Sequence, residues 1–492
     1  MNEHNLTVLD LLERSCAMAP KNVAVVSAAG AMTYEELVAR SKRLGASIAA
    51  ACSGNVVALF FPMVPEFVVA YFGALYSNKC VVPLNLLLPP DQLNYIVKDS
   101  GAAGVVAPPA SALPPELAAK VQQVGVPVHD LAALAANTSA PPVQRKQTPD
   151  DVCTFLYTSG TTGNPKGVML TERNLASNAA SSVIAMRLDA TSRFLACLPT
   201  FHTFAITGTM LAPLAAGASL ATLPKFDPEL VLTAAANLKC DTLLMVPSMY
   251  RLVTRMQERR PQDLKHLRLA IAGGEALPGE VREHFEKVFG LPLLEGYGQT
   301  ESSPIIAVNM PWANKAGTVG RPIPDVRVRI VDPNTSQDLP PDTTGEIWVS
   351  GPNVMKGYHN RPEETEKAIT KDGWLRTGDM GELTPDGYIR ITGRLREMIK
   401  VAGEMVFPAE VEHALLTHAA VFESGVAGAK DERKGEIVKA YVVLKPNEKA
   451  TDEELLQHCR ANLAAYKVPK TIEFRTELPK GPTGKVMRRL LK

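Results

Sequence analysis

The sequence predicts an α/β protein with a large N-terminal domain of parallel sheets covered by helices, a small antiparallel β unit, and a small α+β C-terminal domain. Three observations support this fold class. Apolar, β-branched runs alternate with helix-like stretches for most of the chain, which is typical of parallel sheets. After Gly317 the runs are short and separated by Pro, Gly, Asp and Asn, which favours antiparallel strands. From about Glu397 a helix, a strand and another helix follow, enough for a separate module.

Six short apolar runs are expected to be buried strands, because they have the length of strands and turn-forming residues bound them. In chain order they read "NVVALFF", "KCVVPL", "AGVVAP", "CTFLYT", "DTLLMVP" and "LRLAIAGG". The apolar segment 56–76 approaches the length that spans a membrane, but Pro62, Pro65 and Glu66 divide it. We therefore expect a strand, a turn and a helix there, and no transmembrane segment.

The other elements are predicted from local signals. The Ala/Pro-rich stretch 108–149 has few β-branched runs and several turn signals, so we expect a surface connection. Short runs within residues 326–351 and 387–394 are expected to form the small β unit. In the C-terminal module, "PAEVEHALLTH" and "TDEELLQHCRANLAAY" predict helices and "EIVKAYVVL" predicts a strand.

Composition and charge narrow the class of function. Of 492 residues, 46% are apolar and 21% charged, as in a globular protein. The net charge of +1 gives no global field that would attract nucleic acid, so no such partner is expected. The seven cysteines lack paired spacing, which argues against a zinc site or disulfides and favours reduced core residues. No secretory signal or lipidation tag is recognisable, so we expect a cytoplasmic location.

The stretch "YTSGTTGNPKG", Tyr157–Gly167, combines hydroxyls, glycines and one lysine behind an apolar run. Phosphate oxygens need such donors. The stretch is not a Walker A sequence, because that pattern has Gly before the lysine and Ser or Thr after it, whereas Pro165 precedes Lys166 and Gly167 follows it. On composition alone, a phosphate loop and a solvated Gly/Thr-rich loop remain equally open.

Seven further motifs follow this loop in order along the chain. They read "LPTFHTF", "AGGEALP", "EGYGQTE", "GEIWVSGPNVMKGYHNRPEET", "WLRTGDMGELTPDGYIRITGR", "EMIKVAGEMVFPAEVE" and "PTGKVMRR". Together the eight motifs closely resemble the adenylate-forming acyl-CoA synthetase superfamily, which includes fatty acyl-CoA and aryl-CoA ligases, luciferases and the adenylation domains of peptide synthetases. The resemblance implies stacked αβ sheets and a β-barrel-like unit in a large domain 1–393, a hinge at 394–396, and a mobile small domain 397–492.

The resemblance implies a reaction in two steps that uses ATP, Mg²⁺ and coenzyme A. A carboxylate attacks the α-phosphorus of ATP to give an acyl-AMP, and a thiol then displaces AMP to give a thioester. The loop in the stretch Tyr157–Gly167 would close over the β- and γ-phosphates of ATP. The phosphate-binding residues implied in and beside the loop are Thr158, Ser159, Gly160, Thr161, Thr162, Gly163 and Lys166.

An adenine site and a metal ligand are implied by two neighbouring motifs. Tyr297 resembles the ring that stacks on adenine, a flat apolar group that needs an aromatic face. The opposite wall is implied to consist of Gly274, Glu275 and Ala276. Thr300 resembles the α-phosphate contact, and Glu301 resembles the carboxylate that holds Mg²⁺, a hard cation that prefers oxygen ligands.

The ribose contacts and the mobile domain are implied by the later motifs. Asp379 resembles the carboxylate that accepts both ribose hydroxyls, and Arg394 resembles its partner. Lys485 resembles the lysine that bridges the acid and the α-phosphate as charge builds in the transition state. It can reach the site only if the small domain rotates about a hinge, which the resemblance places at Arg396. Lys400, with the nearby Gly403, would lie on the face used with coenzyme A.

The acid substrate is inferred from a short set of implied pocket positions. They are His202, Gly273, Gly298, Pro304 and Ile305, and His202 is also counted with Lys485, Thr300 and Glu301 as a catalytic candidate. Relatives that activate amino acids have an Asp where this chain has His202, because an ammonium group needs a counter-charge. Arg251 could serve a dicarboxylate, although an exposed helix arginine is the simpler interpretation.

The small or apolar pocket set favours an apolar acyl chain or an aryl acid, and we favour a medium- or long-chain fatty acid. The alternatives left open are an aryl or cinnamic acid, an acyl-AMP ligase that loads a carrier protein, a luciferase-like enzyme, and a degenerate binding protein. The last is disfavoured because the candidate residues for every step are present.

Overall fold

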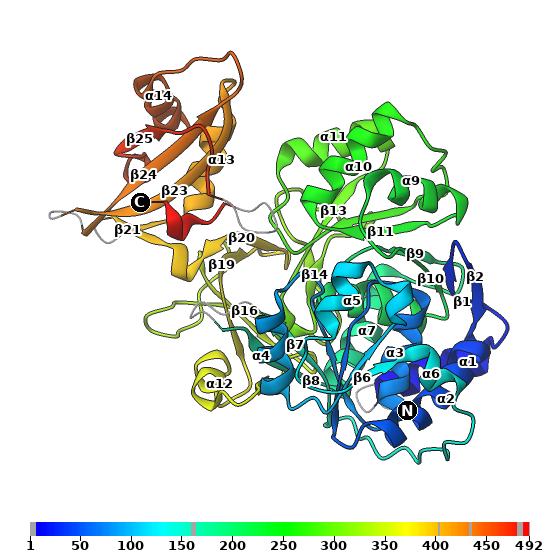
Figure 1. Ribbon diagram of the computed structural model, residues 1–492. Helices are drawn as coiled ribbons and strands as arrows, with labels where there is room; N and C mark the ends of the chain where they lie inside the picture. The colour runs from blue at the N-terminus through cyan, green and yellow to red at the C-terminus, as the bar shows by residue number, and fades with distance from the viewer. Residues whose placement is uncertain (1–5, 159–163, 402–403, 432–434, 480–485, 492) are drawn as a thin grey trace. The chain divides into compact units, whose positions relative to one another are not determined.

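The computed structural model describes residues 6–158, 164–401, 404–431, 435–479 and 486–491. Contacts divide the chain into two compact units, residues 1–328 with 349–375 and residues 329–348 with 376–492 (Figure 1). Most of the small β unit therefore belongs to the same compact unit as the C-terminal module, which the sequence did not indicate. The expected hinge at 394–396 lies inside the second unit and stays a prediction.

Two mixed sheets form the framework of the first unit. The nine-stranded sheet has the order β15 (Arg321–Pro322), β14 (Ile305–Val308), β13 (Leu293–Gly298), β12 (Leu269–Ala272), β11 (Thr242–Met245), β9 (Arg193–Ala196), β10 (Ser219–Thr222), β1 (Val23–Ser27) and β2 (Gly30–Thr33). The seven-stranded sheet has the order β18 (Gly357–Tyr358), β8 (Lys166–Thr171), β7 (Val152–Thr158), β4 (Cys80–Pro83), β3 (Val56–Leu59), β5 (Val105–Ala107) and β6 (Val128–Asp130). All six predicted strands are confirmed, and their mutual pairings are parallel.

Helices alternate with these strands, as the sequence predicts. They are α1 (Val8–Met18), α2 (Tyr34–Ala51), α3 (Pro65–Tyr76), α4 (Pro90–Ser100), α5 (Pro115–Val121), α6 (Leu131–Ala136), α7 (Glu172–Met186), α8 (Ala212–Ala215), α9 (Pro228–Asn237), α10 (Pro247–Arg259), α11 (Gly279–Phe289) and α12 (Pro362–Ala368), with a π-helix at Phe204–Leu211. Segment 56–76 forms β3, a turn and α3, as expected. Within the described part of the chain, no helix combines the length and apolar character that crossing a membrane requires.

One core of the first unit lies between the nine-stranded sheet and the helices α9, α10 and α11, which lie together in Figure 1. The buried Tyr250 of α10 donates its hydroxyl hydrogen to the carbonyl of Leu243 in β11 (2.7 Å). Its ring meets the ring of Phe285 in α11 edge to face, with centroids 5.2 Å apart. Burying such aromatic surface stabilises the sheet against its helices.

The expectation for the stretch 108–149 is wrong in part, because α5, β6 and α6 lie within it. Strand β6 extends the seven-stranded sheet through the pairing of Val128 with Val105. The side chains of Val121 and Leu131 are buried. These elements are so short that their apolar residues show no clear period, and they are stabilised by the sheet edge they cover rather than by local propensity.

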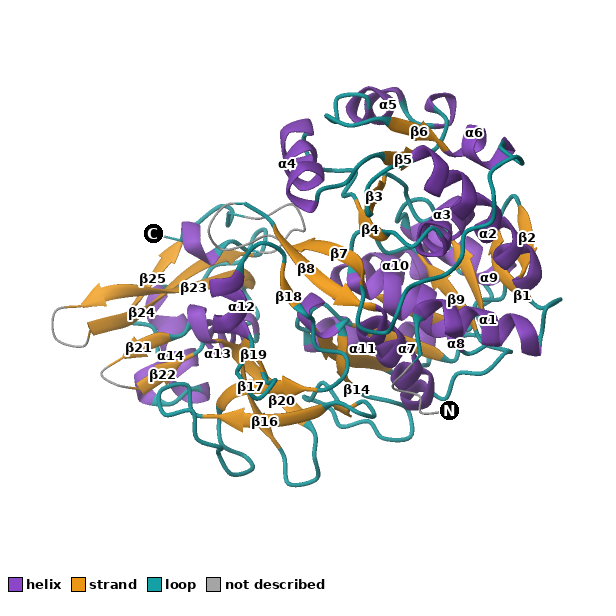
Figure 2. Ribbon diagram, turned by 90° about the horizontal axis from the view of Figure 1, so that it is seen from below, coloured by secondary structure: helices purple, strands orange, loops and turns teal. Residues whose placement is uncertain are grey.

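The described residues of the second unit form two small sheets, two α-helices and short 3₁₀ turns. The first sheet has the order β16 (Arg327–Val331), β17 (Gly345–Ser350), β19 (Leu375–Leu383) and β20 (Ile389–Arg394), and the β19–β20 pair is antiparallel. The second contains β22 (Glu404–Val406), β21 (Ile399–Val401), β24 (Gly435–Leu444), β23 (Val421–Asp431) and β25 (Thr471–Phe474). The predicted helices are α13 (Pro408–Leu416) and α14 (Asp452–Asn462), which share a core with β23 and β24 (Figure 2). The expected fold class is thereby confirmed.

The cysteines are unpaired, as predicted. All seven are free thiols; six are buried and Cys16 is half-buried. They occupy cores in both units.

Glu172 is a fully buried carboxylate at the first position of α7. Its Oε2 accepts a hydrogen bond from the backbone N–H of Val8 (2.8 Å), which fastens α1 to α7. Its Oε1 has no hydrogen-bond partner among the residues that the structure describes. Burial raises the pKa of Glu172 to about 7, because the charged form loses its hydration.

The folded protein therefore holds a proton on Glu172 between pH 4.5 and about 7, where the unfolded chain has released it. The stability that this proton contributes is present below pH 4.5 and is lost as the pH rises through about 7. We expect Glu172→Gln, which keeps an acceptor for Val8, to raise the free energy of unfolding at pH 8 by on the order of 1 kcal/mol, and with it the melting temperature, and to have little effect at pH 5. Melting curves at both pH values check this, with Glu116→Gln on the exposed first turn of α5 as control. An equal effect at both pH values would contradict it.

Candidate active site

The candidate phosphate loop connects two paired strands of the first unit. Strands β7 and β8 form an antiparallel hairpin in which Thr158 pairs with Lys166 and Tyr157 with Gly167. The predicted loop residues Ser159, Gly160, Thr161, Thr162 and Gly163 lie outside the described residues. Thr158 and Lys166 stand at the two ends of the loop, so the structure brings these two candidates together.

Lys166 contacts two residues that the sequence analysis did not single out. Its ammonium forms an ion pair with Glu364 of α12. It also lies 5.4 Å from the ring centroid of Tyr358, a cation–π contact. Tyr358 in turn donates its hydroxyl hydrogen to Oε1 of Glu301 (2.8 Å). Both residues fall in the "KGYHNRPEET" part of a quoted motif, but no local pattern reveals their partners.

The two walls of the candidate adenine site come from neighbouring strands. Strands β12 and β13 are parallel, with Ala272 paired to Glu295, so their carboxyl ends lie at the same edge of the sheet. Residues 273–276 follow β12 directly, and Tyr297 lies near the end of β13. Gly274 has a φ of +81°, a conformation that favours glycine. The structure thus places the predicted stacking ring and the predicted opposite wall on adjacent strands.

A tight turn after β13 carries Thr300 and Glu301. The short helix Thr300–Ser302 begins two residues after Gly298, and its backbone folds back so closely that a Cβ at Gly298 would lie 1.9 Å from the carbonyl oxygen of Pro304. Thr203 donates its hydroxyl hydrogen to Oγ1 of Thr300 (3.2 Å), which ties the turn to the segment after Phe201 and His202.

Two buried asparagines from other parts of the chain form hydrogen bonds with the backbone of this turn. Asn178 of α7 donates its side-chain amide to the carbonyl of Ile305 (2.8 Å) and accepts from the backbone N–H of Ile305 (3.2 Å). Asn353 donates to the carbonyl of Ser302 (2.9 Å). Both contacts join residues far apart in the sequence, so local sequence signals do not predict them.

His202 combines accessibility with partial desolvation. Its side chain is exposed to solvent, yet surrounding protein lowers its pKa, a combination expected for a side chain on the wall of a recess. The neutral form of the imidazole is therefore favoured at pH 7. Its ring packs on that of Phe201, with centroids 4.8 Å apart. Of the other predicted pocket positions, Pro304 and Ile305 are buried.

The ring of Phe204 packs between two glycines close to the predicted pocket. A Cβ at Gly273 would lie 3.2 Å from the ring, and one at Gly208 would lie 3.0 Å from it. Gly273 was predicted as a wall position, whereas Phe204 was not. Phe204 begins the π-helix Phe204–Leu211, a rare local structure that often occurs at functional sites.

The candidate ribose residues pair with each other in the second unit. Asp379 of β19 lies directly opposite Arg394 of β20. Nε of Arg394 is 3.0 Å from Oδ1 of Asp379, and the aspartate side chain is 7% exposed. An ion pair fixes the carboxylate in one orientation, as a group that accepts two hydroxyls requires. The structure brings this pair together, and its role at the ribose stays a prediction.

The hinge and coenzyme A candidates lie beyond β20. Arg396 is exposed in a short helix, Leu395–Glu397, between β20 and β21. Lys400 is also exposed, and its backbone N–H donates to Oε2 of Glu436 (2.9 Å). Gly403 and Lys485 lie outside the described residues.

The described residues on either side of 480–485 are fastened to the rest of the second unit. The backbone N–H of Met487 donates to the carbonyl of Pro479 (2.8 Å). Arg488 forms ion pairs with Glu412 (2.6 Å) and with Glu397.

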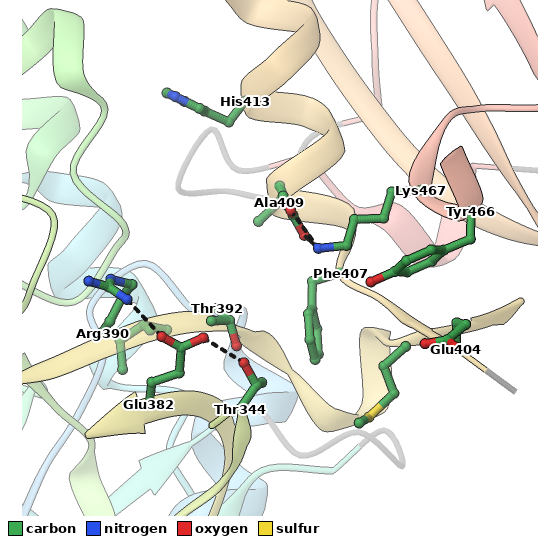
Figure 3. Close-up of a pocket in the computed structure, with 13 residues that line it drawn as sticks. Thr344, Glu382, Arg390, Thr392, Glu404, Phe407, Ala409, His413, Tyr466 and Lys467 are labelled. Atoms are coloured by element: carbon green, nitrogen blue, oxygen red, sulfur yellow. Dashed lines mark hydrogen bonds and ion pairs between the residues drawn. The ribbon is translucent and has the colours of Figure 1, made fainter. Parts of the chain in front are cut away.

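A pocket of about 550 Å³ lies in the second unit, next to β20, β22 and α13 (Figure 3). Figure 3 shows the Glu382 carboxylate between Arg390 and Thr344, with distances of 2.7 Å to each. Lys467 is similarly paired with Glu410 (2.7 Å). The described residues that line the pocket include none of the predicted site residues, so it is not the predicted site.

The turn after β13 gives a sharp test of the site's packing. We expect Gly298→Ala to destabilise the protein by about 1–3 kcal/mol and to weaken ATP binding, because the added methyl group would force the Thr300–Glu301 turn away from β13. Thermal unfolding and calorimetric titration with ATP measure the two effects. Gly279→Ala is the matched control, since a Cβ there meets nothing within 4 Å. Unchanged binding in the Gly298 variant would show that the turn does not position nucleotide ligands.

Comparison with known proteins shows the family of this chain. The family model described as "AMP-binding enzyme" matches residues 12–359, and the one described as "AMP-binding enzyme C-terminal domain" matches residues 410–485. A long-chain-fatty-acid–CoA ligase of Bacillus subtilis (strain 168) is 34% identical, over 99% of this chain and 94% of the relative. A feruloyl-CoA synthase of Amycolatopsis sp. is 36% identical, over 96% of each chain.

Solved structures agree. ATP-bound MatB from Rhodopseudomonas palustris has a TM-score of 0.88 at 31% identity, over 99% of this chain and 98% of that chain. An o-succinylbenzoate CoA synthetase (MenE) from Bacillus subtilis, in complex with the acyl-adenylate intermediate OSB-AMP, has a TM-score of 0.86 at 29% identity, with the same coverage. The chain therefore belongs to the AMP-binding enzyme family and is an acid–CoA ligase of the adenylate-forming type.

Proposed function

We propose that this ligase uses ATP and Mg²⁺ to activate a medium- or long-chain fatty acid as an acyl-AMP and then transfers the acyl group to coenzyme A in the cytoplasm. The observation that carries the choice of acid is the uncharged character of the predicted pocket. His202 is its only titratable member, and the surrounding protein lowers the pKa of the imidazole, which favours its neutral form. A neutral wall offers no counter-charge to an ammonium or to a second carboxylate, whereas an apolar chain needs none.

Arg251 does not support a dicarboxylic acid. It lies on α10 with its side chain 42% exposed, and it forms an ion pair with Glu280 (2.7 Å). An arginine that recognises a distal carboxylate would be aimed into a pocket rather than paired at the surface. This favours the simpler interpretation of Arg251 as an exposed helix residue.

The geometry of the first unit supports the proposed nucleotide-binding roles. Lys166 and the backbone of the β7–β8 loop would bind the β- and γ-phosphates, and Tyr297 would stack on the adenine ring. The carboxylate of Glu301, held by the Tyr358 hydroxyl, fits an Mg²⁺ ion, which prefers oxygen ligands. When bound, the ion would neutralise charge on the phosphates.

In the first step, an oxygen of the fatty acid carboxylate attacks the α-phosphorus and pyrophosphate leaves. Thr300 would donate a hydrogen bond to the α-phosphate, and Lys485 would neutralise charge that grows there. In the second step, the thiol of coenzyme A attacks the acyl carbon, loses its proton and displaces AMP. Rotation about Arg396 would exchange the face carrying Lys485 for the face carrying Lys400.

Two other acid–thiol ligases remain as alternatives. A feruloyl-CoA synthase and a 4-coumarate–CoA ligase are among the relatives, at 36% and 33% identity, so an aryl acid is the first alternative. Transfer of the acyl group to a carrier protein in place of coenzyme A is the second. Both alternatives keep the nucleotide site and differ in the acyl pocket or in the thiol.

The proposal is tested by measuring pyrophosphate release with fatty, aryl, dicarboxylic and amino acids, with and without coenzyme A, while thioester is followed by mass. We expect the highest kcat/KM with fatty acids and a thioester product that requires coenzyme A. Preference for an aryl acid would replace the substrate class. Pyrophosphate release without a thioester would instead indicate a carrier-protein acceptor.

Lys485 gives a prediction that separates the two steps. We expect Lys485→Ala to slow acyl-AMP formation by roughly 10²–10³-fold, the scale for losing one preorganised donor, while thioester formation from supplied acyl-AMP is largely kept. Lys470→Ala, at an exposed lysine of the same unit, is the control. Equal loss in both half-reactions would remove Lys485 from this role.

A further inference from the structure

Lys166 is held by an anion of the protein itself. Its ammonium forms an ion pair with Glu364, and the two side chains are 19% and 31% exposed. A partly buried ion pair of this kind is less screened by salt than one on the open surface. The lysine proposed to bind ATP phosphates is therefore already engaged by a carboxylate.

The backbone at Glu364 is fixed beside the β7–β8 hairpin, which carries Lys166. The neighbouring Thr365 of α12 accepts a hydrogen bond from the backbone N–H of Tyr358 (2.9 Å) and donates its hydroxyl hydrogen to the carbonyl of Arg361 (2.9 Å). Tyr358 lies in β18, which pairs with β8, the strand that Lys166 begins. The backbone thus keeps Glu364 within reach of Lys166.

Tyr358 connects the same lysine to the candidate metal ligand. Its ring lies under the ammonium of Lys166, with 5.4 Å between the nitrogen and the ring centroid. Its hydroxyl donates to Oε1 of Glu301 (2.8 Å), and the backbone N–H of Met355 donates to the carbonyl of Glu301 (2.9 Å). One side chain therefore touches both the phosphate-binding candidate and the metal-binding candidate.

These contacts have a direct electrostatic consequence. A triphosphate that approaches Lys166 brings several negative charges next to Glu364, and like charges at short range repel. The contact between Lys166 and Glu364 therefore opposes a contact between Lys166 and a phosphate. We propose that Glu364 is an internal anion that competes with ATP phosphates for Lys166, and that Tyr358 is a positioning residue that holds Glu301 while Lys166 changes partner. This inference rests on the proposed function, because it takes Lys166 as a phosphate ligand.

The competition is tested by calorimetric titration of the full chain with a non-hydrolysable ATP analogue in Mg²⁺, without any acid. We expect Glu364→Gln to lower the Kd of the analogue by about 3- to 10-fold, the scale of one partly exposed ion pair. Glu363→Gln is the matched control, because it removes the same charge from the adjacent, exposed position of α12. An unchanged or higher Kd in the Glu364 variant overturns the competition.

A double-mutant cycle shows whether the effect passes through Lys166. In a Lys166→Met background, Glu364→Gln should leave the Kd unchanged, since no ammonium remains to be released. If Glu364→Gln tightens binding equally with and without Lys166, the carboxylate acts only as a distant charge and the proposed exchange of partners is wrong.

Tyr358→Phe tests the positioning role separately. This variant keeps the ring beneath Lys166 and removes only the hydroxyl that contacts Glu301. Without Mg²⁺, we expect the Kd of the analogue to be unchanged. When Mg²⁺ is added, the analogue binds more tightly, and we expect the Mg²⁺ concentration that gives half of this gain in affinity to rise about 3- to 10-fold. If that Mg²⁺ concentration does not change, Tyr358 does not position Glu301.

The titrations also distinguish a failure of this inference from a failure of the proposed function. A wild-type chain that does not bind the analogue would refute the nucleotide site itself. A wild-type chain that binds it, together with a Glu364→Gln variant of the same affinity, would refute only the internal competition.

Discussion

The arrangement of the first unit depends on the position of β8 between β7 and β18. Strand β7 is joined to β8 directly in a hairpin, whereas β18 lies almost two hundred residues later in the chain. Backbone hydrogen bonds from His359 to Gly167 (2.8 Å) and from Lys356 to Met169 (3.0 Å) fix this long-range register. A shift of one residue would turn Tyr358 to the opposite face of the sheet and separate it from Lys166 and Glu301.

The parallel sheets explain why so many candidate ligands are found on loops. Strands β11 and β12 are buried and apolar along their whole length, and the candidate ligands follow at the carboxyl ends of β12 and β13. Glycines are concentrated at these ends for two distinct reasons. Gly274 adopts a positive φ, whereas Gly298 has ordinary dihedrals and is required because the carbonyl of Pro304 approaches it so closely. Rigid strands thus present short turns whose backbone is fixed on both sides.

The sequence predicted the strands and the local turns better than the contacts between them. Six apolar runs became β3, β4, β5, β7, β11 and β12, since each is buried on both faces and reads as a continuous run. The short elements of 108–149 were missed because the sheet edge, rather than local periodicity, determines them. Tyr358, Glu364, Asn178 and Asn353 could not be found from spacing, because each acts on a partner distant in the sequence. The pairing of Asp379 with Arg394 was the exception, since a resemblance supplied it.

The burial of the cysteines has a consequence for an enzyme that handles a thiol substrate. Burial raises the pKa of every cysteine in the chain, to about 12 for Cys197 and Cys240 and about 11 for Cys459. At neutral pH almost none of these side chains is a thiolate, and the thiolate is the form that attacks disulfides. A low thiolate fraction disfavours exchange between these cysteines and the oxidised disulfide of coenzyme A.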